Sequence, residues 1–292
     1  MKIAFMVATR GNPRRALAVI ECAKALASGR HTIEFSVGID GDDVQSNYFF
    51  RRNMPALPLS IGNRPPGVGA VWNRLVAAAP GADVYCPFPD DCFIGTPDWD
   101  ETIAMVLEHG FPDRRLGVIA WNDLANPGQC TLPIVTREWL ELTGPLYDER
   151  FPFWFYDTCV DELVSFIAGR PAPVIPTLVL AAKKGLTQRM RELDFWWDLY
   201  VATRYDRLHL ASRIRRELGI ELPPGHLVRV LMGWRARDIE GRRALPDVEA
   251  ALAAHRDQRP SAEYITARAA AEAYMATARF QPLEAAVAEL VA

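Results

Sequence analysis

The fold is decided by residues 84–91, which read VYCPFPDD. The first part of this stretch is apolar, and it ends directly in the carboxylates of Asp90 and Asp91. Adjacent carboxylates repel each other unless a cation or hydrogen-bond donors compensate their charge. An apolar strand that ends in an acidic pair therefore predicts a ligand site at the carboxyl edge of a sheet.

Apolar strands and helical stretches alternate on both sides of this segment. Pro13 suits the first turn of a helix, and Gly29 and Gly110 suit helix ends. This alternation predicts an α/β domain with a mostly parallel sheet flanked by helices. The expected strands are Ile3–Ala8, Ile33–Ile39, Val84–Pro87, Leu116–Trp121, Thr131–Val135 and Val174–Leu180, and the expected helices are Pro13–Ser28, Val68–Ala79, Asp98–His109 and Trp154–Ala168.

Residues 185–292 follow a different pattern, with long helical periods, no strand of comparable quality, no lysine and 16 arginines. We therefore expect a sheet domain at residues 1–184 and an all-helical C-terminal extension at residues 185–292. The expected helices of the extension are Gln188–Leu218, Leu227–Trp234, Pro246–His255, Ala262–Ala278 and Leu283–Val291, with breaks at Gly219, Pro223-Pro224, Gly225, Gly241 and Pro260.

The composition is that of an ordinary globular chain, since half of the 292 residues are hydrophobic and 24% are charged. The net charge of −3 gives no electrostatic case for nucleic acid or an anionic membrane as the partner. We expect no signal peptide and no transmembrane segment, because no run approaches the roughly 18 apolar residues of a membrane span. Five irregularly spaced cysteines favour neither a zinc site nor disulfides, so a cytoplasmic location is expected, with peripheral association with the inner face of a membrane left open.

Polar groups follow the expected strands where each strand ends. The segment 9–12 (TRGN) follows the first strand, 40–43 (DGDD) the second, and Asn122-Asp123 the strand that ends at Trp121. Because parallel strands end at one edge of a sheet, these groups should converge there with Asp90 and Asp91. Such an edge suits a diphosphate held through a divalent cation, since hard cations take carboxylate oxygens and bridge phosphates. Taken alone, the segments 9–12 and 40–43 could each be an ordinary turn.

Two common nucleotide-binding loops are absent from the sequence. Neither G-x-x-x-x-G-K-S/T nor a clean G-x-G-x-x-G after the first strand is present, which argues against a kinase and a dehydrogenase.

With these motifs in order, the chain resembles the family-2-like glycosyltransferases of the GT-A fold over about residues 1–180. The resembling segments are an opening strand and turn, a second strand with a terminal Asp, a glycine-to-Asn helix, a DXD-type motif, a Pro/Trp segment and an acidic motif. They correspond to Phe5–Pro13, Val37–Asp43, Gly69–Arg74, Val84–Asp91, Thr96–Asp100 and Phe153–Asp157. The chain departs from the family pattern in lacking a full Asp-x-Asp and a Glu before Asp157.

The resemblance implies an enzyme that moves a sugar from a UDP- or GDP-sugar to an acceptor hydroxyl, with Mn²⁺ or Mg²⁺ and with inversion. The acceptor, whether a glycan, a lipid-linked molecule or a protein, is left open. The residues it implies are Thr9, Arg10, Asp40, Asn73, Arg74 and Asp90 for the nucleotide, Asp91 and Asp90 for the metal, and Asp157, with Asp161 in reserve, for the catalytic base that deprotonates the acceptor.

Two features of the catalytic-base segment also have an explanation that needs no function. Asp157 and Asp161 are four residues apart and so share a helix face, which could simply be a solvated acidic face. The aromatic run at 151–156 could stack on sugar rings or belong to the core. Both alternatives stay open on the sequence alone.

An arginine-rich stretch with upstream aromatics marks the extension. A basic helix of this kind can bind a membrane surface, a phosphorylated acceptor or nucleic acid. Acidic residues interleave with the arginines, so a packing helix with a mixed-charge face is favoured, and dimerisation through the extension is left open. The arginines concerned are Arg204, Arg207, Arg213, Arg215 and Arg216.

Two other functions remain as alternatives. A nucleotidyltransferase would need a glycine-rich loop followed by a lysine after the first strand, whereas residues 9–15 contain one glycine and no lysine. A non-catalytic nucleotide- or sugar-binding module could keep the same fold without turnover.

Overall fold

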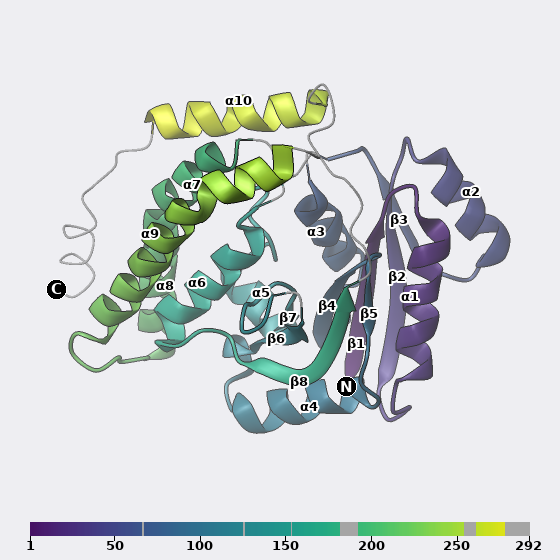
Figure 1. Cartoon of the computed structure of the whole chain (residues 1–292). Coiled ribbons are helices and arrows are strands. Elements are labelled where there is room, and N and C mark those ends of the chain that lie inside the picture. Colours follow the sequence, from purple (N-terminus) through teal and green to yellow (C-terminus); the bar gives the residue numbers. More distant parts are fainter. Residues whose placement is uncertain (66, 125, 153, 182–191, 254–260, 278–292) are drawn as a thin grey trace. The chain divides into compact units, whose positions relative to one another are not determined.

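The computed structural model describes the chain apart from residues 66, 125, 153, 182–191, 254–260 and 278–292 (Figure 1). The chain forms two compact units. Unit 1 comprises Met1–Tyr147 and Ala172–Lys184, and unit 2 comprises Asp148–Pro171 and Gly185–Ala292. This differs from the expected division for residues 148–171, whose helix packs with the helices of unit 2. The expected helix Leu283–Val291 and the start of Gln188–Leu218 lie outside the described residues.

Unit 1 is built on an eight-stranded sheet with the order β3-β2-β1-β4-β7-β6-β8-β5. β1 is parallel to both of its neighbours, β2 and β4, and the pairs β2–β3 and β6–β8 are parallel as well. β7 and β5 run antiparallel to their neighbours. The expectation of a mostly parallel sheet is confirmed. The strands are β1 (Lys2–Thr9), β2 (Thr32–Asp40), β3 (Leu59–Gly62), β4 (Val84–Pro89), β5 (Cys92–Ile94), β6 (Val118–Asp123), β7 (Pro133–Thr136) and β8 (Val174–Ala181).

Helices cover both faces of this sheet because side chains alternate along its strands. Ile3, Phe5 and Val7 of β1 pack in one buried cluster with α1 (Pro13–Ala25) and α4 (Trp99–Gly110). α3 (Val68–Ala78) packs against the opposite face, where a Cβ added at Gly38 would lie 2.4 Å from a methyl carbon of Val71. The glycine therefore allows α3 to approach β2 closely, and Figure 1 shows α1 and α3 on either side of β1 and β2.

Four elements of unit 1 were not expected from the sequence. They are α2 (Val44–Asn53), β3, β5 and α5 (Arg137–Thr143), besides a short 3-10 helix, η1 (Arg114–Leu116). α2 begins after Asp43, whose carboxylate accepts the backbone N–H of Ser46 at 3.1 Å. Such a cap satisfies a backbone donor that the helix itself leaves without a partner.

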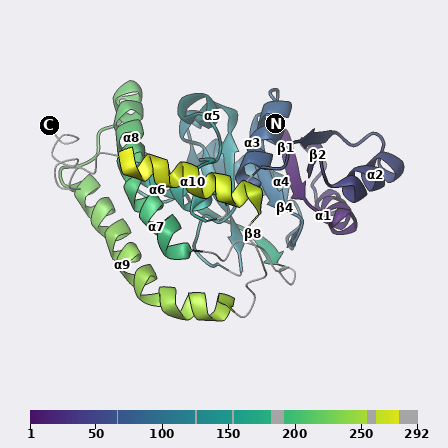
Figure 2. The ribbon, with the colours of Figure 1, turned by 90° about the horizontal axis from the view of Figure 1, so that it is seen from above.

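Unit 2 is helical in its described residues (Figure 2). Its helices are α6 (Tyr156–Ala168), α7 (Leu193–Ala202), α8 (Arg204–Leu218), α9 (His226–Ala253) and α10 (Ala262–Thr277). The expected break at Gly241 is wrong, since α9 continues through both Gly241 and Pro246. A Cβ at Gly241 would lie 1.9 Å from the ring of Trp197, so this glycine makes room for an aromatic side chain instead of ending the helix. None of the described helices is both long and apolar enough to span a membrane.

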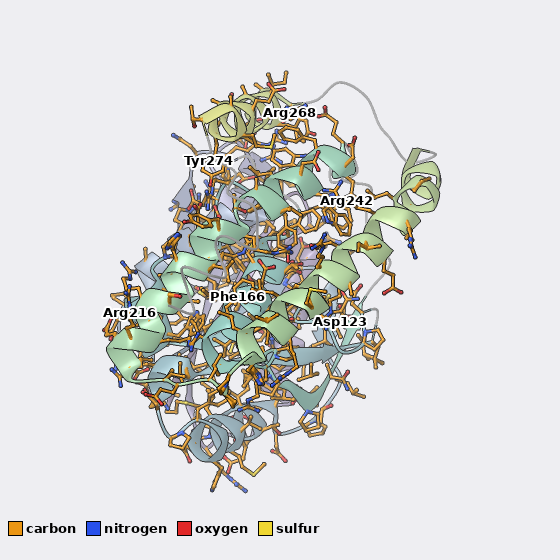
Figure 3. The ribbon with its side chains drawn as sticks, turned by 90° about the vertical axis from the view of Figure 1, so that its left-hand side faces the viewer. Asp123, Phe166, Arg216, Arg242, Arg268 and Tyr274 are labelled. Atoms are coloured by element: carbon orange, nitrogen blue, oxygen red, sulfur yellow. The ribbon has the colours of Figure 1, made fainter. Side chains whose placement is uncertain are left out.

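One face of the arginine-rich α8 is buried within unit 2. Arg204 and Arg207 are buried against the fully buried carboxylate of Glu162 on α6, each with its Nε 2.5 Å from a different carboxylate oxygen. The packing interpretation is therefore confirmed for these two arginines. Figure 3 labels Arg268 and Tyr274 on α10, where the Arg268 guanidinium lies over the ring of Phe195 and the Tyr274 hydroxyl donates to Asp206 at 2.8 Å.

Candidate functional site

The carboxyl ends of β1 and β4 form a topological switch point. The chain leaves β1 toward β2 on one side, while β4 lies on the other, and open α/β sheets bind ligands at such points. Thr9 ends β1, and its hydroxyl donates to Oδ2 of Asp90, which follows β4, at 2.6 Å. The structure thus brings together two of the residues expected to contact a nucleotide.

Asp91 follows Asp90 directly and is buried. Its side chain is 9% exposed, and its closest described partner is the thiol of Cys92, which donates to Oδ1 at a long 3.8 Å. Among the described residues, no three His, Cys, Asp or Glu side chains gather into a ligand set for a metal ion. Asp91 with Asp90 fits a cation such as Mg²⁺, which takes one or two carboxylates and fills its remaining positions with phosphate oxygens and water.

Asp40 ends β2 and is 7% exposed. Its Oδ2 accepts a hydrogen bond from Nη1 of Arg10 at 2.9 Å, whereas its Oδ1 is buried without a partner in the part of the chain that the structure describes. Burial raises the pKa of this carboxyl, and the hydrogen bond from Arg10 opposes the rise. Buried polar atoms are almost always hydrogen-bonded, so the unpartnered Oδ1 of Asp40 is an unusual feature of this strand end.

Arg10 is held by carboxylates and does not extend freely toward a ligand. Besides its bond to Asp40, its guanidinium forks onto both oxygens of Asp42 at 2.5 and 2.8 Å. The next residue, Gly11, donates its backbone N–H to Asp43 at 2.8 Å. The loops after β1 and β2 are therefore joined. Arg10 was expected to bind a phosphate of the nucleotide, but the carboxylates of Asp40 and Asp42 already balance its positive charge.

Arg74 reaches from α3 to the carboxyl ends of β2 and β3. It donates from Nη2 to the carbonyl of Ile39 at 3.0 Å and from Nε to the hydroxyl of Ser60 at 3.2 Å. A Cβ at Gly62 would lie 2.5 Å from Nη1 of Arg74. The guanidinium thus fixes the strand ends behind Asp40, and its charge, like the hydrogen bond from Arg10, opposes the rise that burial causes in the pKa of that carboxyl.

Gly62→Ala should displace the Arg74 guanidinium from Ile39 and Ser60 and lower stability by about 1–3 kcal/mol, because hydrogen bonds of a charged group are lost. Gly81→Ala is the matched control, since the nearest atom to its new Cβ would be 3.4 Å away. We expect the control to stay within about 0.5 kcal/mol of the wild type in urea denaturation. Equal denaturation midpoints for the two variants would show that the Gly62 contact is unimportant.

Asn73 has a structural task in this fold. Its amide nitrogen donates to the carbonyl of Tyr147 at 2.9 Å, and its amide oxygen accepts the N–H of the same residue at 3.0 Å. Asn73 therefore fixes the backbone at the end of the first segment of unit 1. Its expected contact with a nucleotide remains a prediction.

The two candidate bases belong to unit 2, on α6. Asp157 is half-buried in the first turn and accepts the N–H of Thr158 at 2.7 Å, while burial raises its pKa to about 6. Asp161 is 6% exposed, and a guanidinium nitrogen of Arg237 lies 4.0 Å from its carboxylate. The alternative of a solvated acidic face is wrong for this helix, because residues 159–167 are all buried.

The aromatic run before Asp157 belongs to the core of unit 2 in its described part. Phe151 and Phe155 are buried, and Phe155 stacks on Tyr200 with ring centroids 4.8 Å apart. Phe155 also takes a left-handed backbone conformation, with φ of 69°, directly before α6. A bulky residue seldom adopts this conformation unless its surroundings enforce it, and such strain often accompanies functional sites.

The sequence placed the segment 40–43 at the strand-end edge but assigned a role to Asp40 alone, not to Asp42 or Asp43. The segment 40–43 was open to interpretation as an ordinary turn, whereas each of its three carboxylates contacts the loop after β1. The spacing of Asp43 to Ser46 is a helix-start signal that could have revealed α2 and with it the fixed position of this loop.

Comparison with solved structures identifies the fold. A mannosyltransferase, PcManGT from Pyrobaculum calidifontis, solved in complex with GDP-Man and Mn²⁺, is 13% identical; the match covers 97% of this chain and 82% of that one, with a TM-score of 0.50. GalNAc-T7, solved with UDP, GalNAc and Mn²⁺, is 10% identical; the match covers 81% of this chain and 57% of that one, with a TM-score of 0.53. The chain matches no protein-family model and no curated protein. The fold of this chain is therefore the GT-A fold of nucleotide-sugar glycosyltransferases.

Proposed function

We propose that this protein transfers a sugar from a nucleoside-diphosphate donor to an acceptor hydroxyl. The observation that carries the proposal is the set of buried carboxylates at the switch point, where Asp40 keeps a bare oxygen and Asp91 lies beside the Thr9–Asp90 pair. This set combines acceptors for the N–H and O–H groups of a nucleoside with oxygens for a divalent cation. The two solved structures of the same fold, which contain GDP-Man or UDP together with Mn²⁺, support the same assignment.

Each strand-end carboxylate has a proposed part in donor binding. Asp40 accepts a hydrogen bond from the nucleobase or ribose through its free oxygen, and Asp90 contacts the ribose or the cation. Asp91 holds Mn²⁺ or Mg²⁺, which would neutralise the charge that develops on the leaving diphosphate. Thr9 orients Asp90, while Arg10 and Arg74 hold the walls of the site through the contacts given above.

Asp157 is the proposed base for an inverting transfer. A general base works best when its pKa lies near the operating pH, and burial raises the pKa of Asp157 to about 6. Asp161, one helical turn further along α6, is the reserve base.

Release of nucleoside diphosphate tests the proposed function. The protein is incubated with UDP-sugars and with GDP-sugars in Mn²⁺ or Mg²⁺, with a panel of glycan, lipid-linked and peptide acceptors, and free UDP or GDP is measured. We expect release from one donor class and stimulation by the correct acceptor. Consumption of a nucleoside triphosphate with release of pyrophosphate would instead indicate a nucleotidyltransferase, and binding of donor without release under all acceptors would indicate a non-catalytic module.

Asp91→Asn should remove the metal-dependent part of nucleoside-diphosphate binding, because the neutral amide is a poor ligand for a hard cation. In the wild type, a nucleotide at 100 times its Kd should add about 2.7 kcal/mol to the free energy of unfolding, and Mn²⁺ should supply much of that gain. Thermal denaturation with UDP or GDP, with and without Mn²⁺, measures the difference. Asp98→Asn is the control, since Asp98 is exposed and Asn tolerates its left-handed backbone; an undiminished Mn²⁺ effect in Asp91→Asn would contradict the assignment.

A further inference from the structure

The loops after β1 and β2 are joined by a clasp, which we define as Arg10, Gly11, Asp40, Asp42 and Asp43. Nη1 of Arg10 lies 2.9 Å from Oδ2 of Asp40 and 2.5 Å from Oδ1 of Asp42, and Nη2 lies 2.8 Å from Oδ2 of Asp42. The backbone N–H of Gly11 donates to Asp43 at 2.8 Å. The guanidinium thus directs its two-pronged fork at Asp42 and gives Asp40 a single hydrogen bond.

Asp42 differs from the other carboxylates of the clasp in its exposure. Its side chain is 52% exposed, and among the described side chains it forms hydrogen bonds only with Arg10. An exposed ion pair of this kind contributes only about 0–1 kcal/mol to stability. The carboxylate of Asp42 therefore contributes little to packing, and its hydrogen bonds to described side chains all go to Arg10.

That orientation decides how much of Asp40 a ligand can use. A guanidinium frequently binds one carboxylate through two parallel N–H groups, and this arrangement is among the stronger ion-pair geometries. With Asp42 in place the fork is occupied, and Oδ1 of Asp40 stays without a partner in the described part of the chain. Without Asp42, the same guanidinium is free to turn its fork onto Asp40 and to occupy the oxygen that a ligand would need.

We propose that Asp42 is a positioning residue of the nucleotide site: it holds the fork of Arg10 so that Asp40 keeps one carboxylate oxygen for the nucleoside. This inference rests on the proposed function, and it adds a residue whose effect passes through another side chain. Loss of Asp42 should weaken binding of a nucleoside diphosphate about tenfold, the factor that corresponds to one hydrogen bond to a charged group.

A double-mutant cycle tests the inference. UDP and GDP are titrated in the presence of Mn²⁺ into the wild type, Asp42→Asn, Arg10→Ala and the double variant, and Kd is measured by calorimetry. Asp42→Asn should raise Kd about tenfold in the wild-type background and leave it unchanged in the Arg10→Ala background, because the fork that could block Asp40 is then absent. The melting temperature of ligand-free Asp42→Asn should equal that of the wild type.

Asp113→Asn is the matched control. Asp113 is 37% exposed and accepts a fork from Arg115, with Nε at 3.0 Å from Oδ1 and Nη2 at 2.8 Å from Oδ2, near η1 and outside the clasp. Its Kd should be that of the wild type. Three results would each overturn the positioning role. They are a wild-type Kd in Asp42→Asn, a rise in Kd on Asp42→Asn that is as large in the Arg10→Ala background as in the wild type, and a marked fall in the melting temperature of Asp42→Asn. A wild type that binds neither nucleotide would overturn the proposed function itself.

Discussion

Asp157→Asn should slow sugar transfer by about 10²–10⁴-fold and leave the Kd of the nucleoside diphosphate unchanged, because a general base contributes to the chemical step and not to donor binding. The amide cannot take the proton of the acceptor hydroxyl. Burial raises the pKa of Asp157 from 3.8 to about 6, so the wild-type rate should rise with pH as this carboxyl loses its proton and should fall below about pH 6. Single-turnover rates between pH 5 and pH 8 measure this limb of the profile.

Asp194→Asn is the control for this variant, since Asp194 is an exposed carboxylate in the first turn of α7. It should transfer sugar at the wild-type rate. If Asp157→Asn keeps the wild-type rate, or if the limb near pH 6 survives in that variant, Asp157 is not the base. If Asp161→Asn loses sugar transfer and Asp157→Asn does not, Asp161 is the base.

Glu162→Gln should destabilise unit 2 by about 3–5 kcal/mol, the range found when one partner of a buried ion pair is removed. Glu162 is completely buried and accepts hydrogen bonds from Nε of Arg204, Nε of Arg207 and the hydroxyl of Tyr200. Without its charge, Arg204 retains Asp238, whereas Arg207 retains only the Thr203 hydroxyl and the Tyr200 carbonyl as described hydrogen-bond partners. A buried guanidinium without a carboxylate is the cause of the expected loss.

Hydrogen exchange at the backbone amides of α6 and α8 measures this effect in unit 2 by itself, which matters because a chain of two units need not unfold in one step. Glu240→Gln on α9 is the control, since Glu240 is exposed. The control should change the free energy of opening by less than about 0.5 kcal/mol. Protection in Glu162→Gln equal to that of the control would contradict the account of the buried cluster.

The sheet and the meeting of polar side chains at its carboxyl edge could be predicted because both follow from local pattern. Apolar runs indicated the six longer or buried strands, and parallel strands necessarily end at one edge, so Thr9 and Asp90 were expected to meet. β3 and β5, of four and three residues, are too short to leave a clear period, and α2 is marked mainly by the Asp43 cap. These elements were missed for that reason.

The contacts that individual side chains make could not be predicted, since they depend on the conformation of loops and on tertiary packing. Arg10 and Arg74 stand where phosphate ligands would be expected, yet Arg10 bonds to carboxylates and Arg74 to the backbone and Ser60. The helical period of α6 is plain in the sequence, but its membership of unit 2 depends on packing against α8. Gly241 has the chemistry of a helix breaker, and only the position of Trp197 explains why it lies inside α9.

Titration of the wild-type protein with UDP and with GDP, in the presence and in the absence of Mn²⁺, shows whether the strand-end carboxylates bind a nucleoside diphosphate through a metal ion. We expect one of these nucleotides to bind in Mn²⁺ and to raise the melting temperature, and we expect omission of Mn²⁺ to weaken this binding. Absence of binding by both nucleotides in Mn²⁺ would contradict the assignment of the strand-end carboxylates as a nucleoside-diphosphate site.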